Sequence, residues 1–275
     1  MILLISPKNV YATKRLVEEA KLKKVKMEVF DVADLVERKF EIDAKQYNVL
    51  YVRMPYLNGS PKYIPNIIKL AKKFKAAGKK VVDSVIAEGE LARGKYEDYL
   101  KLKKSGLPIP RTNKQLTINN LQLTDYPFIA KWIYGFKGRG TFYISSRDDL
   151  KNIPSYIPKD ELLAQEFIPA EYEYKIITVG YKALPVILRF KIDPKTHRSD
   201  FNKYDVIRGK AGQLISRLAG RASKVLGREL AKADILQKGK KFYILEVNRF
   251  PGLDSFEELT KYNIAKEFLK YLTEK

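Results

Sequence analysis

The chain has 275 residues, a formal net charge of +21 and no cysteine. The lack of thiols excludes disulfides, iron–sulfur clusters, cysteine-ligated zinc and a catalytic thiol, and the single histidine, His197, excludes a two-histidine metal site within one chain. A hydrophobic fraction of 45% is enough for a substantial core and argues against global disorder.

The first part of the chain predicts a small parallel α/β sheet. Strands are predicted at Met1–Ile5, Met27–Phe30, Val49–Val52 and Lys80–Val82, and amphipathic helices at Thr13–Lys24, with Thr13 as the N-cap, and Ile64–Ala77. This alternation of strands and helices is typical of parallel pairing. The opening apolar run is too short for a signal peptide or a membrane span, so we expect a cytoplasmic protein without membrane contact.

The remainder of the chain predicts a mostly antiparallel α+β body, because its strands follow one another with few helices between them. The boundary is expected near Ser84–Leu91, which gives an N-terminal α/β domain over 1–88 and a second domain over 89–275. The expected strands are Phe128–Lys131, Thr141–Ile144, Leu162–Phe167, Tyr174–Val179, Ala183–Phe190, Ala231–Leu236 and Phe242–Val247. The expected helices are Tyr96–Ser105, Gly212–Leu226, Asn263–Leu272 and one capped by Ser146 with Asp149.

Three oxygen-bearing side chains near the C-terminus form a candidate magnesium site. Glu246 and Asn248 share one face of a predicted strand, and oxygen ligands of this kind suit magnesium. Asp234 joins that face if the two strands pair about Lys240, whereas a two-residue turn at Gly239-Lys240 puts it on the opposite face. The alternative is a set of polar residues on a solvated face of the sheet.

Two further segments suggest a nucleotide. Lys131 ends an apolar strand and is followed by the glycine-rich stretch 135–140, where lysine and backbone N–H groups can contact phosphates. The stretch matches neither a Walker A nor a Rossmann motif, and an ordinary hairpin is the alternative. The polar pair Gln165-Glu166 inside an apolar strand fits an adenine-binding hinge or, alternatively, a solvated edge strand.

In this order, these segments resemble the ATP-grasp superfamily, and within it the RimK-type carboxylate–amine ligases related to ribosomal-protein glutamate ligase. Additional likeness lies in Tyr11–Ala20, Ala92–Lys95, Gly106–Thr112 and Pro251–Leu253. The resemblance implies an α/β N-terminal domain and an ATP-grasp domain over 89–275. A lid subdomain near 112–166 would be one of two subdomains that enclose the nucleotide cleft.

The resemblance also implies roles for individual residues. ATP would be contacted by Lys95 and Lys131 at the phosphates, by the lid glycines Gly135, Gly138 and Gly140, by the adenine hinge Gln165, Glu166, Phe167 and Ile168, by Glu173 at the ribose, and by Lys203. Asp234, Glu246 and Asn248 would hold magnesium, with manganese as a possible substitute, and Arg189 and Arg208 would lie near the γ-phosphate and the acyl group. The chain departs from the family pattern at Glu173 and Lys175, where Asp and Arg are common, and at Arg249, which is expected either at the surface or against an acidic substrate.

The implied activity is ATP-dependent formation of an amide or peptide bond through an acyl phosphate. The expected partners are an amino acid such as glutamate and an acidic protein tail, carrier protein or small carboxylate acceptor, and the family usually forms dimers or tetramers. Two alternatives remain: a basic nucleic-acid-binding protein without catalytic activity, which the charge fits, and an ATP-grasp protein that binds nucleotide without catalysis. A hydrolase triad built on His197 is disfavoured because no Gly-x-Ser-x-Gly segment is present.

Overall fold

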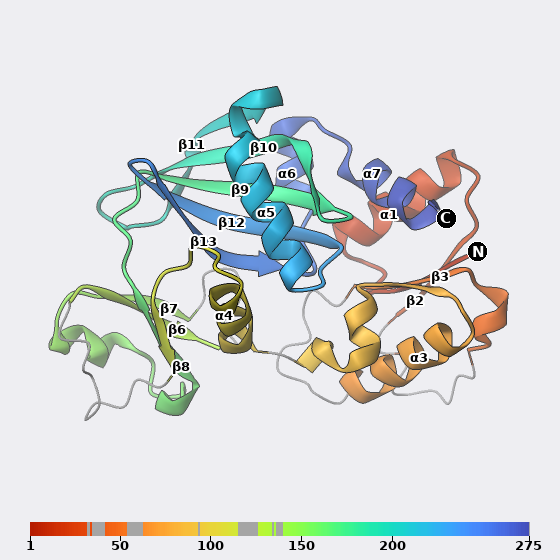
Figure 1. Ribbon diagram of the computed structural model, residues 1–275, viewed down its shortest axis with the longest axis horizontal. Helices are drawn as coiled ribbons and strands as arrows, with labels where there is room; N and C mark the ends of the chain where they lie inside the picture. Colours follow the sequence, from red (N-terminus) through yellow and green to blue (C-terminus); the bar gives the residue numbers. More distant parts are fainter. Residues whose placement is uncertain are drawn as a thin grey trace.

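The computed structural model describes residues 1–274 except 32–33, 35–41, 54–62, 93, 115–125, 134 and 136–139. Within this part of the chain lie a four-stranded parallel sheet, a five-stranded antiparallel sheet and a four-stranded antiparallel sheet (Figure 1). These sheets confirm the predicted combination of an α/β N-terminal part with a mostly antiparallel α+β body. None of the helices in the described ranges is long and apolar enough to cross a membrane.

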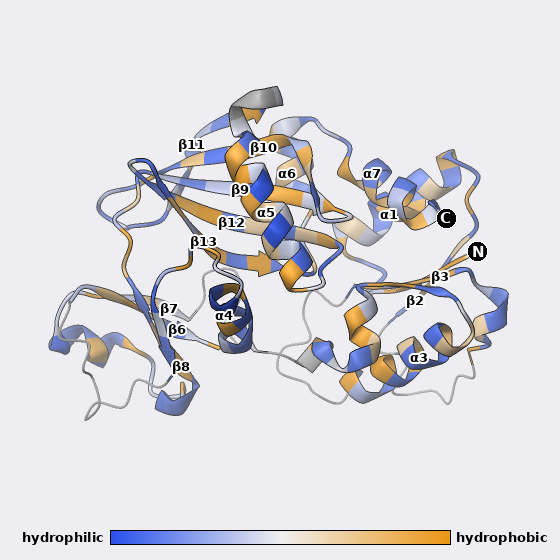
Figure 2. Ribbon diagram, viewed as in Figure 1, coloured by the Kyte–Doolittle hydropathy of each residue, from blue (hydrophilic) through white to orange (hydrophobic). Residues whose placement is uncertain are grey.

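The N-terminal sheet has the strand order β2-β1-β3-β4, and all of its pairs are parallel, as predicted. Its elements are β1 (Ile2–Ile5), α1 (Tyr11–Leu22), β2 (Met27–Phe30), the 3-10 helix η1 (Ala44–Gln46), β3 (Val49–Val52), α3 (Ile64–Ala76) and β4 (Lys80–Val82). Helix α3 is amphipathic (Figure 2) and buries Ile67, Leu70, Ala71 and Phe74 against the sheet. The 3-10 helices η3 (Ser84–Glu88) and η4 (Glu90–Ala92) follow β4.

Helix α1 begins earlier than predicted, and Thr13 does not cap it. The helix starts at Tyr11, and Val10 occupies the N-cap position. Thr13 is buried, and its hydroxyl lies 2.7 Å from the hydroxyl of Ser6 at the end of β1. The prediction of an N-cap was wrong because this hydroxyl has a tertiary partner.

The five-stranded sheet is the centre of the molecule, with the strand order β11-β10-β9-β12-β13. Its strands are β9 (Tyr172–Val179), β10 (Lys182–Ile192), β11 (Ser199–Arg208), β12 (Leu230–Lys238) and β13 (Lys241–Asn248). After η7 (Gly209–Gly212), helix α5 (Gln213–Val225) covers one face of the sheet (Figure 1). The opposite face packs against α6 (Asp254–Thr260), α7 (Ile264–Thr273) and the N-terminal sheet. Neither β11 nor α6 was predicted.

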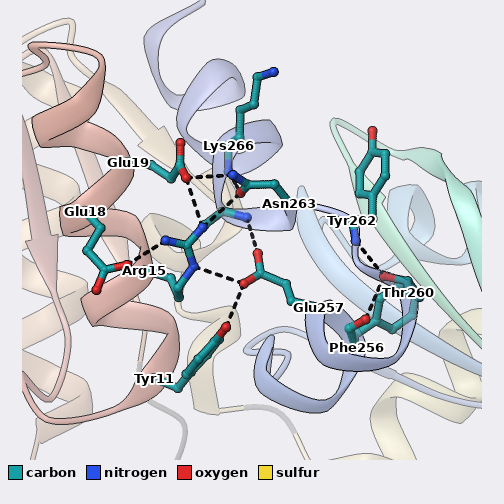
Figure 3. A network of polar contacts seen from close by, with 11 residues as sticks. Tyr11, Arg15, Glu18, Glu19, Phe256, Glu257, Thr260, Tyr262, Asn263 and Lys266 are labelled. Carbon is teal, nitrogen blue, oxygen red and sulfur yellow. Dashed lines mark hydrogen bonds and ion pairs between the residues drawn. The ribbon is translucent and has the colours of Figure 1, made fainter.

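A polar network joins α1 to the C-terminal helices. Arg15 of α1 donates to Glu257 of α6 at 3.2 Å and to Asn263, which caps α7, at 3.3 Å (Figure 3). Glu19 of α1 accepts from Arg15 at 2.9 Å and from Asn263 at 2.6 Å. The first helix and the last two helices are therefore held together at the side of the molecule where both termini lie (Figure 1).

The third sheet lies beyond α4 (Lys95–Lys104) and has the order β5-β8-β6-β7 (Figure 1). Its strands are β5 (Thr112–Lys114), β6 (Phe128–Trp132), β7 (Thr141–Ile144) and β8 (Leu162–Glu166), with the 3-10 helices η5 (Arg147–Asn152) and η6 (Lys159–Glu161). The capping box of Ser146 and Asp149 is present, although the helix it begins is a 3-10 helix. This sheet lies within 112–166, and the domain boundaries themselves stay a prediction.

Candidate functional site

A β-bulge in the hairpin of β12 and β13 brings two carboxylates together. The strands are joined by the two-residue turn Gly239-Lys240. Regular pairing from that turn would place Asp234 and Glu246 on opposite faces. The extra residue Leu245 shifts the register, so that Asp234 pairs directly with Glu246. Because of the bulge, Asp234 lies on the same face as Glu246 and Asn248, which the alternation of side chains alone left open.

The two carboxylates and Asn248 converge on one face of the sheet. The side-chain amide of Asn248 donates to Glu246 Oε1 at 2.8 Å and to Asp234 Oδ2 at 3.4 Å. Asp234 is buried, and its Oδ1 has no hydrogen-bond partner among the described residues. A buried carboxylate oxygen that accepts no hydrogen bond is energetically unfavourable, and a bound cation would stabilise it.

These donors fit magnesium that is shared with a nucleotide. In the described ranges, no three His, Cys, Asp or Glu side chains gather in a way that could hold a metal ion alone. Proteins commonly bind magnesium through one or two carboxylates together with substrate phosphates and water. Asp234, Glu246 and Asn248 match that pattern, in which phosphate oxygens complete the coordination.

Two lysines flank the carboxylates on the same face. Lys232 Nζ lies 3.1 Å from Asp234 Oδ2. Lys175 of β9 is directly opposite Asp234, and its Nζ donates to Glu173 Oε1 at 3.2 Å. Glu173 also accepts from the Ser199 hydroxyl. The face thus alternates negative and positive side chains, which suits a polyanion bound together with a cation.

Burial and the neighbouring lysines shift the pKa values of the two carboxyl groups in opposite directions. Burial would raise the pKa of Glu246, but nearby lysines outweigh burial and lower this pKa to about 2; they are Lys131, Lys232 and Lys95. Burial raises the pKa of Asp234 to about 6, against the opposing effect of Lys232. Of the two carboxyl groups, Glu246 therefore stays ionised to the lower pH.

Lys131, near the end of β6 in the third sheet, and Lys95, at the start of α4, both lie close to these carboxylates. Lys131 Nζ donates to the Tyr99 hydroxyl at 3.2 Å. Lys95 Nζ donates to the Gly135 carbonyl at 2.6 Å. The structure brings both predicted phosphate lysines within electrostatic reach of Glu246.

Two of the three predicted lid glycines are described. Gly140 has φ +79°, and a Cβ there would lie 2.8 Å from the Trp132 Cβ. The backbone N–H of Trp132 donates to the Gly140 carbonyl at 2.7 Å. Glycine is therefore required at position 140 by backbone conformation and by close approach. Gly135 is described, whereas Gly138 lies outside the described residues.

The side chains of the predicted adenine hinge have structural partners. Gln165 is buried, and its amide donates to Thr112 Oγ1 at 3.0 Å. Glu166 accepts from the backbone N–H of Arg111 at 3.1 Å. Both side chains hold β5 against β8. A contact between adenine and the hinge would therefore use backbone groups, including those of the following residues Phe167 and Ile168, and it stays a prediction.

The structure does not bring Arg189 to this site, which corrects the expectation for it. Arg189 lies opposite Tyr174 and Asp205, on the face that packs against α5. Its guanidinium donates to Asp205 at 2.7 Å and lies over the ring of Tyr172. Asp234 projects from the opposite face, because its cross-strand partner on β9 is Lys175.

The two other basic residues predicted in this region differ in their placement. Lys203 has a side chain that is 68% exposed and pairs with Asp200 at 3.3 Å, so the structure does not bring it to the carboxylates either. Arg208 lies opposite Val186, on the same face as Lys175, and donates to the Thr260 carbonyl at 2.7 Å. Its catalytic role stays a prediction.

Arg249 is neither at the surface nor available to an acidic substrate, which corrects both expectations. Its guanidinium pairs with Asp83 at 2.7 Å, and both side chains are buried. Burial lowers the pKa of Arg249 below its usual range. The residue after Asn248 therefore ties β13 to the end of β4.

Sequence reasoning missed three members of the site: Tyr99, Lys175 and Lys232. Lys175 was noted only as a departure from the family pattern. Tyr99 follows Lys95 by four residues, and Lys232 precedes Asp234 by two. The helical and strand periods place each of them on the same face as its neighbour, so these spacings could have indicated both.

Comparisons with known proteins find a matching family model and several relatives. A family model described as RimK-like ATP-grasp domain matches residues 85–272. A probable alpha-L-glutamate ligase of Vibrio vulnificus (strain YJ016) is 23% identical over 96% of this chain and 92% of its own length. A second one, of Legionella pneumophila (strain Corby), is 22% identical over 67% of this chain and only 64% of its own length.

Solved structures share the fold. The ATP-grasp ligase PsnB, complexed with a minimal precursor, magnesium and ADP, superposes with a TM-score of 0.75 at 15% identity, covering 98% of this chain and 96% of that one. The macrocyclase MdnC of Microcystis aeruginosa MRC, bound to its precursor peptide, gives a TM-score of 0.73 at 13% identity and covers 100% and 99% of the two chains. D-alanine–D-alanine ligase of Bacillus anthracis gives 0.64 at 14% identity, with 98% and 95% covered.

Proposed function

Since this chain belongs to the RimK-like ATP-grasp family of ATP-dependent ligases, we propose that it is a magnesium-dependent carboxylate–amine ligase. It joins an amino acid such as glutamate to an acidic acceptor through an acyl phosphate. The single observation that carries this proposal is the convergence of Asp234, Glu246 and Asn248, produced by the bulge at Leu245, beside four lysines.

The chemistry follows from the poor leaving group of a carboxylate. Transfer of the γ-phosphoryl group of ATP to a carboxylate oxygen gives an acyl phosphate and ADP. The amine then attacks the carbonyl carbon, the C–O bond to phosphate breaks, and inorganic phosphate leaves as the amine loses a proton. Such transfers depend mainly on positioning and on neutralisation of charge, so a catalytic nucleophile on the protein is not needed.

The residues of the site divide this work by their charge. Lys95 and Lys131 neutralise the phosphates, and Asp234, Glu246 and Asn248 hold magnesium. Magnesium, when bound, supplies Lewis-acid neutralisation of the phosphate oxygens. Lys175 and Lys232 balance the two carboxylates, so that the site is not strongly anionic before nucleotide binds. This arrangement favours an anionic nucleotide complex at this face.

The proposed substrates are supported by the names of relatives and by the net charge, and not by the geometry of the site. Relatives named as probable alpha-L-glutamate ligases favour glutamate as the amino acid, and PsnB and MdnC, which are bound to precursor peptides, favour a peptide acceptor. A net charge of +21 favours an acidic acceptor, because opposite charges steer association. Acceptor affinity is therefore expected to fall as salt is added.

The test combines nucleotide binding with product identification. The purified protein is titrated with ATP at several magnesium concentrations, and then incubated with ATP, an amino-acid mixture and acidic peptides for mass spectrometry. We expect magnesium-dependent binding, release of ADP, and an acceptor mass increased by one or more amino-acid residues. Asp234→Ala should abolish all three.

Two results would contradict the proposal in different ways. Failure of the wild-type protein to bind ATP, with steeply salt-dependent affinity for any DNA or RNA, would favour the nucleic-acid-binding alternative. Magnesium-dependent ATP binding without ADP release in the presence of any amino acid and acceptor would favour a nucleotide-binding protein without catalysis.

A further inference from the structure

Tyr99 lies between the predicted phosphate-binding and metal-binding residues. It is 5% exposed, and its hydroxyl donates to the Leu245 carbonyl at 2.7 Å while it accepts from Lys131 Nζ at 3.2 Å. Lys131 Nζ also lies 5.9 Å from the centre of the Tyr99 ring. One hydroxyl group on α4 thus contacts a lysine of the third sheet and the backbone of the central sheet.

The carbonyl that Tyr99 holds belongs to the bulge residue itself. Leu245 is the extra residue that lets Asp234 pair with Glu246, and its carbonyl belongs to the peptide group that leads into Glu246. The preceding N–H, that of Ile244, donates to the Pro108 carbonyl at 2.8 Å. Two hydrogen bonds from α4 and the segment after it therefore set the bulge, and with it the direction in which Glu246 leaves the strand.

A phenol can donate only one hydrogen bond, and this decides which partner of the Tyr99 hydroxyl is the acceptor and which is the donor. A phenol hydroxyl has one proton, which Tyr99 gives to the Leu245 carbonyl, so the oxygen lone pairs are directed to the Lys131 ammonium. A movement of Lys131 and a movement of the bulge each disturb the same oxygen. Packing of the Tyr99 ring would not by itself produce this coupling.

We infer that Tyr99 is a positioning residue that couples the phosphate-binding Lys131 to the bulge beneath the metal-binding carboxylates, so that nucleotide and magnesium bind as a unit. This inference rests on the proposed function, since it takes Lys131 to contact phosphate and Glu246 to hold magnesium.

The test is Tyr99→Phe, which keeps the buried ring and removes only the hydroxyl. We expect the magnesium concentration for half-maximal ATP binding to rise about tenfold, the typical effect of losing a group that orients metal ligands. The protein without nucleotide should lose no more thermal stability than the Tyr47→Phe variant, because each change removes one buried hydroxyl and leaves the ring packed. Tyr47→Phe is the matched control, because Tyr47 is equally buried and its hydroxyl donates to Glu28 at 2.6 Å in the N-terminal part of the molecule.

A double-mutant cycle reads the coupling directly. In a Lys131→Met background, Tyr99→Phe should change the magnesium requirement less than threefold, because the two groups act through one contact. A merely structural role for Tyr99 would instead lower affinity equally at every magnesium concentration and in both backgrounds.

Each outcome has a distinct meaning. If wild-type protein binds no ATP, the proposed function fails. If wild-type protein binds ATP and Tyr99→Phe stays within twofold of it at every magnesium concentration, the inference about Tyr99 is overturned while the function stands. If Tyr99→Phe does not fold, Tyr99→His, which retains a ring donor, is compared with Tyr99→Leu in the same titration, and equal magnesium requirements overturn the inference.

Discussion

Arg249, the residue after β13, and Asp83, the residue after β4, form a buried ion pair with 2.7 Å between guanidinium and carboxylate. Asp83 also accepts from the backbone N–H of Glu229 at 2.6 Å. The pair joins the N-terminal sheet to the central sheet, next to the predicted metal ligand Asn248. The position of the candidate metal site therefore depends on contacts with the first sheet, although its ligands all come from the central one.

Removal of one partner of this pair should be strongly destabilising. Arg249→Met leaves the Asp83 carboxylate, and Asp83→Asn leaves the Arg249 guanidinium, buried without an opposite charge, which is expected to lower the free energy of unfolding by about 3–5 kcal/mol. Urea unfolding measures the change. The exposed pair of Lys151 and Asp148, with side chains 80% and 83% exposed, is the control. Lys151→Met should cost less than about 1 kcal/mol, and equal losses at the two pairs would contradict the expectation.

Gly140→Ala, before β7 of the third sheet, should lower the stability of the protein more than Gly239→Ala, in the turn between β12 and β13. Both glycines have a positive φ, but a Cβ at Gly140 meets the Trp132 Cβ at 2.8 Å, whereas nothing lies within 4 Å of a Cβ at Gly239. Conformational strain alone should cost about 1 kcal/mol at either position, and the close approach adds to it at Gly140. Thermal unfolding of the two variants compares them, and equal losses would show that the approach of β7 to β6 is not tight.

Lys131→Met and Arg189→Met separate the two faces of the central sheet. Lys131 acts on Glu246, whereas Arg189 pairs with Asp205 on the face next to α5. We expect Lys131→Met to weaken ATP binding about a hundredfold, consistent with losing a buried charge-assisted contact, and Arg189→Met to stay within about threefold, since its pair is exposed. Isothermal titration with ATP and magnesium measures both. A large loss in Arg189→Met alone would reverse the assignment of faces.

The network in Figure 3 predicts an acid-sensitive step in stability. Burial would raise the pKa of Glu19, but hydrogen bonds from Asn263 and Arg15 lower it below the ordinary value of 4.5. A carboxyl whose pKa is lower in the folded state stabilises the fold above its unfolded-state pKa, and this contribution is lost as the pH falls below it.

Glu19→Gln should therefore flatten the dependence of unfolding free energy on pH below 4.5. Urea unfolding between about pH 5 and pH 3 tests this. Glu18→Gln serves as the control on the same helix, because Glu18 also contacts Arg15 but is 58% exposed. A slope unchanged in Glu19→Gln, or changed equally in both variants, would contradict the interpretation.

Much of the fold follows from local patterns in the sequence. The parallel sheet of β1 to β4 and the strands β6, β7, β8, β9, β10, β12 and β13 were predicted, because buried strands are continuous apolar runs and their helices are amphipathic. Strand β11 was not predicted, because an exposed edge strand needs no apolar pattern: Phe201–Asp205 are all exposed. Thr13 was assigned to a cap because its tertiary partner Ser6 cannot be inferred from spacing.

The sequence by itself determined which residue types the candidate site contains and their order along the chain: a lysine ending a strand, an Asp, and a Glu-x-Asn segment. Only the tertiary structure decided which of them meet. Asp234 and Glu246 share a face because of one inserted residue, Leu245, and Arg189 is turned away by the register of β10. The physical reason is the two-residue period of a strand: a shift of one residue moves every later side chain to the other face, and such a shift is stabilised by distant partners such as Tyr99.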